Sequence, residues 1–154
     1  MCIEGRPKER CASVFVFEVG YRGGTSVTAT FDVGVLVSQG RRNAWGFTVG
    51  YLASEKQYAD TNTSYLDARG AYKARYRRYV GDGGFALDVG AGGGKYGASG
   101  ELALGYRDII AISAGVNTFA TDNGDTDAAA NVGVRLGTTG ILAALYGLAA
   151  LGGR

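Results

Sequence analysis

Charged side chains recur at every second position along parts of this 154-residue sequence, and their spacing could carry chemistry. Arg69, Lys73, Arg75 and Arg77 form a basic ladder within one segment. Residues two apart point to the same face of a β-sheet, so this ladder presents its charges on one side. Such a row either pairs with acids that face it or lines a path that favours anions.

The acidic residues predicted on this same face nearly equal the basic residues in number. An unpaired charge in a narrow interior costs on the order of several kcal/mol, so we expect cross-pairing and keep the anion path as the alternative. The residues predicted on this face are the acids Glu18, Asp32, Asp67, Asp88 and Glu101 and the bases Arg22, Arg69, Lys73, Arg75, Arg77, Arg107 and Arg135.

The residues that most catalytic and cofactor sites require are missing from this sequence. There is no histidine, which removes Ser-His-Asp and Cys-His catalysis and most catalytic zinc sites. The spacing of Cys2 and Cys11 fits no metal signature. Residues 92–97 match G-x-G-x-x-G, but a strand pattern and not a helix follows them, which predicts a hairpin turn. We therefore expect no enzyme activity, cofactor or metal.

A nucleic-acid partner is also not expected. The formal net charge is only +2, so the totals demand no polyanion. Residues 72–79 (YKARYRRY) mix aromatic and basic side chains, which is typical of a surface for single-stranded nucleic acid. In a strand, however, Tyr72 and Tyr76 point away from Lys73, Arg75 and Arg77, so the aromatic rings and these cations would lie on opposite sides of the sheet.

The elements that position these charges are strands. From residue 13 onward, apolar residues alternate with polar or small ones, and glycine, asparagine and aspartate separate the stretches. We predict a polar segment at 1–12 and one all-β domain at 13–154. Its eight candidate strands centre on residues 13–22, 25–38, 45–51, 66–77, 85–92, 101–107, 110–117 and 130–137.

Small residues on the polar face indicate that this face is enclosed. Glycine makes up 27 of the 154 residues, and much of it alternates with the charges, where a soluble barrel would carry long polar side chains. The apolar face would then lie outside. Its aromatic residues gather near two edges, as in the girdles of membrane barrels: Phe15, Trp45, Tyr76, Phe85 and Tyr106 near one, and Tyr21 and Tyr51 near the other.

The pattern in TSVTATFDVGVLVS, NAWGFTVGYL and FALDVGAGG resembles the small bacterial outer-membrane β-barrels of the OmpA and OmpX type, over residues 13–137. The resemblance implies a closed antiparallel up-and-down transmembrane β-barrel in the outer membrane, with lipid as its partner. It implies a structural, surface-interaction or narrow-pore role. The long loops 54–64 and 120–127 are candidates for contact with an extracellular partner. The alternative is a soluble β-barrel that binds an apolar small molecule in its interior.

The end of the chain departs from that resemblance. Such barrels usually finish on a strand, whereas the apolar run at 141–151 follows the eighth candidate strand. Residues 138–154 are therefore either the true last strand or a short apolar helix, and we predict the strand. The run is shorter than the roughly 18–20 residues that a membrane-spanning helix needs.

Overall fold

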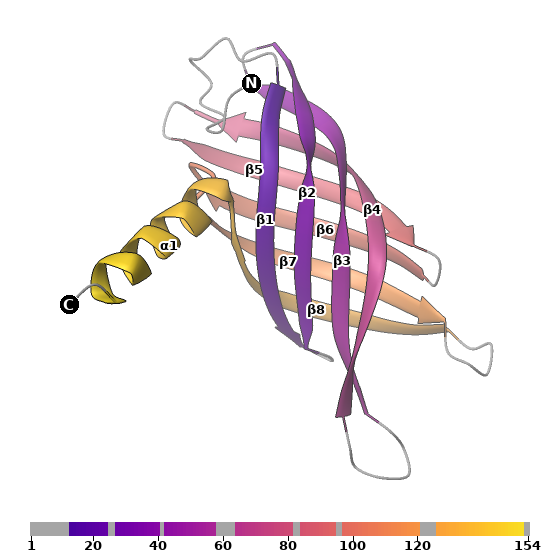
Figure 1. The fold of residues 1–154 in the computed structure, drawn as a ribbon. Coiled ribbons are helices and arrows are strands. Elements are labelled where there is room, and N and C mark those ends of the chain that lie inside the picture. Colours follow the sequence, from indigo (N-terminus) through magenta and orange to yellow (C-terminus); the bar gives the residue numbers. More distant parts are fainter. Residues whose placement is uncertain are drawn as a thin grey trace.

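The structure is a computed structural model that describes residues 13–24, 27–40, 42–57, 64–81, 84–94, 97–120 and 126–152. It confirms an all-β fold in which eight antiparallel strands close into one barrel in chain order (Figure 1). The elements are β1 (Ser13–Gly24), β2 (Thr28–Gln39), β3 (Asn43–Gln57), β4 (Ser64–Val80), β5 (Phe85–Gly94), β6 (Gly97–Tyr106), β7 (Ile110–Ala120), β8 (Thr126–Leu136) and the helix α1 (Thr138–Gly152).

The barrel has two distinct rims. We call the rim where β1 begins and β8 ends the proximal rim, and the opposite one the distal rim. The β3–β4 hairpin is the longest, and it extends beyond the rest of the distal rim (Figure 1). Closure comes from β1 and β8, which pair from Val19 with Leu136 to Gly24 with Asn131. The part of β1 before Val19 thus lies beyond the last β8 partner.

Alternation along the strands separates two surfaces. Charged and small residues point inward and apolar residues point outward, because successive side chains of a strand lie on opposite faces. Glu18 and Arg75 are buried, whereas Phe47 and Leu104 are exposed. A sequence period of two, combined with closure, therefore produces a barrel with a polar interior and an apolar exterior.

The two predicted long loops are shorter than the sequence indicated. β3 and β4 remain paired as far as Gln57 with Ser64, and β7 and β8 as far as Ala120 with Thr126. Backbone hydrogen bonds continue the ladder into residues that lack apolar alternation, and this extension was not visible in the side-chain pattern. The remaining residues of these loops, 58–63 and 121–125, lie outside the described residues.

The prediction of a last strand at 141–151 is wrong, because these residues belong to α1. Alanine and leucine, which favour helix, dominate the segment, and the β-branched residues that favour strands are nearly missing. The barrel also closes without it, since β8 already pairs with β1. Among the described residues, no helix is both long and apolar enough to span a membrane.

Close backbone approach explains Gly46 on the inner face. A Cβ at this position would lie 2.0 Å from the carbonyl oxygen of Val35 on β2. We expect Gly46→Ala to lower the free energy of unfolding by about 1–3 kcal/mol, the usual cost of overpacking. Urea unfolding in detergent micelles measures this change. Gly100→Ala is the control, because nothing lies within 4 Å of its Cβ position. Equal losses in the two variants would contradict the explanation.

Candidate functional site: a charged lumen

Two carboxylates and three guanidiniums form the centre of the lumen. Glu18 on β1 accepts a hydrogen bond from Arg75 on β4 at 2.5 Å, and it lies 3.2 Å from Arg77 and 3.3 Å from Arg135. Asp88 on β5 accepts hydrogen bonds from Arg77 at 2.7 and 2.8 Å and from Arg75 at 3.0 Å, and it also pairs with Arg135 on β8. Each carboxylate thus contacts all three guanidiniums.

A second group of charges continues this cluster toward the distal rim. Glu101 on β6 pairs with Arg22 on β1 and with Arg135, which links the two groups. Lys73 on β4 donates to Asp32 on β2 at 2.6 Å and lies 3.5 Å from Glu101. Together these residues form the lumen network: Glu18, Arg22, Asp32, Lys73, Arg75, Arg77, Asp88, Glu101 and Arg135. It crosses the interior and joins β1, β2, β4, β5, β6 and β8.

Burial makes this network sensitive to any loss of balance. The paired side chains are only 2–6% exposed, so little water screens or solvates them. Pairing offsets the large desolvation cost of buried charges only if every member keeps its partners. The geometry favours the expected cross-lumen pairing over a continuous path of unpaired arginines and lysine. Chemically, the arrangement can seal the interior and cross-link the wall.

An apolar cluster adds to the seal near the proximal rim. Val14 and Val16 on β1 point inward with Leu36 on β2 and Ala44 on β3, and all four are buried. The sequence indicated this cluster, since these parts of the first two strands carry apolar residues on both faces. The interior is therefore filled by hydrocarbon near one rim and by ion pairs in the middle.

Sequence reasoning located most of the lumen charges but not all of them. Nine of the predicted residues are in the network: Glu18, Arg22, Asp32, Lys73, Arg75, Arg77, Asp88, Glu101 and Arg135. Arg69 lies on the inner face of β4 and is half-buried. The backbone of Asp67 pairs with Ser54, but its side chain lies outside the described residues.

The prediction that Arg107 lines the lumen is wrong. It lies in the turn between β6 and β7 and is exposed, with its guanidinium 5.2 Å from the centre of the Tyr106 ring. Arg107 and Asp108 both have positive φ, 48° and 54°, so the chain turns here and the strand alternation ends. The prediction continued the alternation of β6 by one residue beyond its end, and this placed Arg107 on the inner face.

Asp108, which was not predicted as a site residue, is the group that this turn brings inward. Its side chain is 4% exposed and lies 3.6 Å from Arg77. Burial raises the pKa of Asp108 to about 6, although the Arg77 guanidinium acts in the opposite direction. The signal in the sequence was the Arg107-Asp108 turn, because aspartate tolerates positive φ.

The raised pKa predicts that stability falls as the pH rises from about 4 to about 6. The folded state holds the Asp108 proton more tightly than the unfolded state does, so deprotonation in this window favours unfolding. Asp108→Asn, which keeps an uncharged side chain suited to positive φ, should remove this slope. It should also raise the free energy of unfolding at pH 7 by about 1–3 kcal/mol. Urea unfolding at pH 4.5 and 7 measures both, and an unchanged slope would contradict the assignment.

The outer wall is apolar and nearly free of charge. Of the outward-facing strand residues whose side chains the structure describes, only Arg78 is charged. The predicted girdle residues all point outward: Tyr21, Trp45, Tyr51, Tyr76 and Phe85 are exposed, and Phe15 and Tyr106 are half-buried. Phe85 and Tyr106 contact each other across β5 and β6, with ring centres 5.0 Å apart. This surface is the opposite of a typical water-facing barrel wall.

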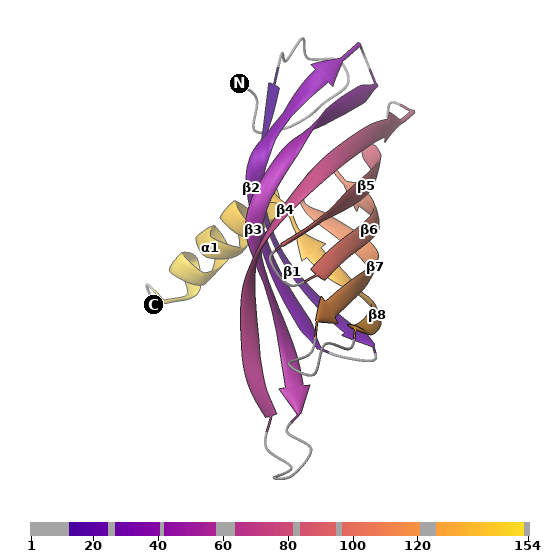
Figure 2. The same cartoon turned by 90° about the vertical axis from the view of Figure 1, so that its right-hand side faces the viewer.

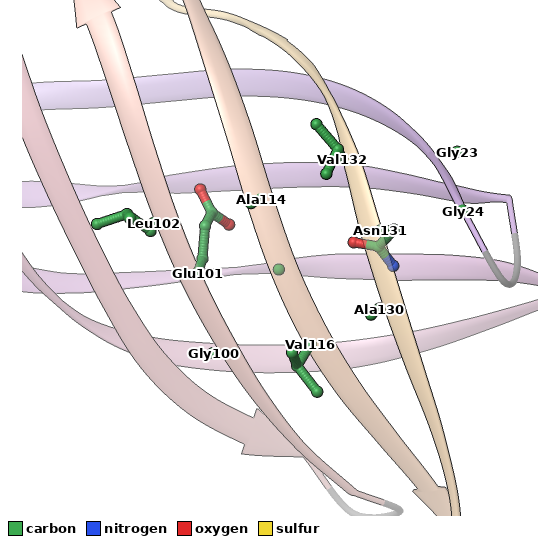
Figure 3. A pocket seen from close by; sticks show the side chains of 11 residues that line it. Gly23, Gly24, Gly100, Glu101, Leu102, Ala114, Val116, Ala130, Asn131 and Val132 are labelled. Atoms are coloured by element: carbon green, nitrogen blue, oxygen red, sulfur yellow. The ribbon is translucent and has the colours of Figure 1, made fainter.

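A cavity of about 480 Å³ lies in the wall where β6, β7 and β8 meet the end of β1 (Figure 3). Exposed side chains of Leu102, Val116 and Val132 border it, and small residues such as Gly100 and Ala114 form its base. The cavity has a mainly apolar lining and therefore offers no cluster of reactive groups.

Among the described residues, no three histidine, cysteine, aspartate or glutamate side chains are placed to hold a metal ion. Comparison of the chain with protein families, with curated proteins and with solved structures finds no match.

Proposed function

We propose that this protein is an outer-membrane β-barrel of a bacterium, with a sealed lumen and a structural or surface-interaction role. The observation that carries the proposal is the outer wall. Val49, Leu104 and Ile112 are more than half exposed, and the residues paired with them on the adjacent strands are apolar or aromatic. Contiguous apolar surface on this scale marks contact with a membrane or another protein. A closed barrel can enter lipid because each strand pairs with a neighbour on both sides along the middle of the wall.

The interior argues against an apolar ligand held inside the barrel. An apolar ligand inside a soluble barrel would need an apolar cavity, whereas the described middle of the lumen holds ion pairs. The network also favours a sealed barrel over an anion pore, because Arg75 and Arg77 already have carboxylate partners. The surface for a macromolecular partner would then be the distal rim, where the β3–β4 hairpin extends furthest.

Refolding into phosphatidylcholine vesicles tests the membrane proposal. We expect the urea-unfolded chain to fold when diluted into vesicles, to float with them, and to change its gel mobility when heated. In buffer without lipid or detergent we expect aggregation, because the apolar wall would face water. A folded, monodisperse protein in plain buffer would refute the proposal and favour the soluble barrel.

Recording in planar bilayers tests the sealed lumen with the same preparation. We expect no steady conductance, because buried ion pairs fill the described middle of the lumen. Stable anion-selective currents that fall in an Arg75→Gln variant would overturn the seal and favour the narrow pore.

A further inference from the structure

α1 is apolar around its whole circumference. It carries no charged residue, residues 142–151 are all exposed, and Tyr146 is 83% exposed. A surface helix of a soluble protein has a polar face opposite its apolar stripe, and a helix that is apolar on all sides is normally buried in a core or in a membrane. α1 has no polar face, and no described residue packs around its exposed part as a protein core would, so something other than the described residues must cover it.

The helix is attached to the outer wall of the barrel. The Thr138 hydroxyl accepts a hydrogen bond from the Phe17 N–H at 3.1 Å and lies 3.3 Å from the Phe17 carbonyl oxygen, to which it can donate. Phe17 lies on β1 between Phe15 and Tyr21, and thus within the apolar wall. Both ribbon views show α1 leaving this wall sideways and extending away from the barrel (Figures 1 and 2).

The first turn of α1 lies beside the proximal end of the β1–β8 seam, where β1 continues without a β8 partner. β1 has β8 partners only from Val19 onward, so its preceding residues present an edge without a neighbouring strand. In antiparallel register, Thr138 occupies the place that a further β8 residue would take opposite Phe17. Its side chain replaces the missing backbone partner there. Unsatisfied backbone groups are costly in lipid, so a cover at this edge matters if the wall lies in a bilayer.

The placement favours lipid as the cover for α1. A second protein chain would cover one side of a projecting helix and leave the opposite leucines bare, whereas lipid surrounds it completely. The 15 residues of α1 span about 22 Å, less than the roughly 30 Å of a hydrocarbon core, so the helix does not cross. It is longer than the roughly 15 Å of one leaflet, so within that leaflet it must lie tilted toward the membrane plane.

We infer that α1 is a lipid-embedded helix in the leaflet nearest the proximal rim, and that its first turn covers the open edge of β1. This inference rests on the proposed membrane location and adds an anchor outside the barrel wall. It assigns α1 an interaction surface for acyl chains and Thr138 the role of positioning that helix against the seam.

Tryptophan quenching tests separately whether the barrel wall lies in lipid and whether α1 does. Trp45 is the single tryptophan and lies on the outer wall, so the wild-type protein reports on the barrel. A Trp45→Phe, Tyr146→Trp variant moves the only indole to α1. Both proteins are refolded into vesicles of phosphatidylcholine brominated on its acyl chains, and iodide is added to the water. We expect bromine to remove most of the emission of each protein, and iodide to change little.

The outcomes distinguish failure of the inference from failure of the proposed function. If bromine quenches the wild-type protein but not the Tyr146→Trp variant, the barrel is in lipid and the inference about α1 is overturned. Quenching of that variant only at low protein density would also overturn it, because a second copy would then cover the helix when protein is abundant. If bromine quenches neither protein, the proposed function fails, and the inference fails with it.

Amide hydrogen exchange tests the seam. Thr138→Val removes the hydroxyl that accepts from Phe17, and we expect the Phe17 amide to exchange faster in this variant in vesicles. Thr139→Val is the matched control, and it should leave this amide unchanged. Equal exchange in both variants would overturn the role of Thr138 at the β1 edge.

Discussion

Glu18→Gln is expected to lower the free energy of unfolding by about 3–5 kcal/mol, the usual result of removing one partner from a buried ion-pair network. Glu18 lies within 3.3 Å of Arg75, Arg77 and Arg135, so its loss leaves three buried guanidiniums around Asp88. Glutamine keeps the size of the side chain but not its charge. The urea midpoint in detergent micelles, with the slope held equal, measures the loss.

Two further variants show whether charge balance is the cause. Thr48→Val changes an equally buried inward residue whose hydroxyl has no hydrogen-bond partner among the described residues, and it should be neutral or stabilising. Combining Glu18→Gln with Arg75→Gln removes one charge of each sign, and the loss should be smaller than the sum of the two single losses. Additive losses, or a loss below about 1 kcal/mol for Glu18→Gln alone, would show that the network is not balanced as described.

Val49→Arg is expected to lower the free energy of unfolding in vesicles by about 2–4 kcal/mol, because the arginine side chain would lie in the hydrocarbon near the bilayer midplane. Val49 is 62% exposed and lies on β3 between the aromatic residues Trp45 and Tyr51. Those two positions mark the predicted girdles, so Val49 occupies the band between them. Equilibrium urea unfolding from phosphatidylcholine vesicles provides the measurement.

The control for this substitution is Gln39→Arg, at an exposed position where β2 ends at the proximal rim. In a membrane barrel it should be nearly neutral, because the side chain reaches water or headgroups. In a soluble barrel, both variants should lie within roughly 0.5 kcal/mol of the wild type. Equal and small effects would therefore count against a lipid-facing wall.

The strand order and the inward charges were predictable because both follow from local alternation. Glu18, Arg75 and Asp88 each lie on the polar face of their strand, which the alternation in the sequence shows directly. Closure of the barrel then turns that face toward the lumen. Arg107 was misplaced because the period cannot indicate the residue at which a strand turns. α1 was misread because an apolar run of this length suits a strand or a helix until the closed barrel excludes another strand.

By itself, the sequence determined the number of strands and the face on which most strand residues lie, since a period of two is set by neighbouring residues alone. Only the tertiary structure decided which acid meets which base, how Asp108 is buried, and where β1 is left without a partner. Those features depend on the register between strands and on how β1 and β8 close the barrel. Register and closure join residues far apart in the chain, such as Glu18 and Arg135, whose meeting no local pattern specifies.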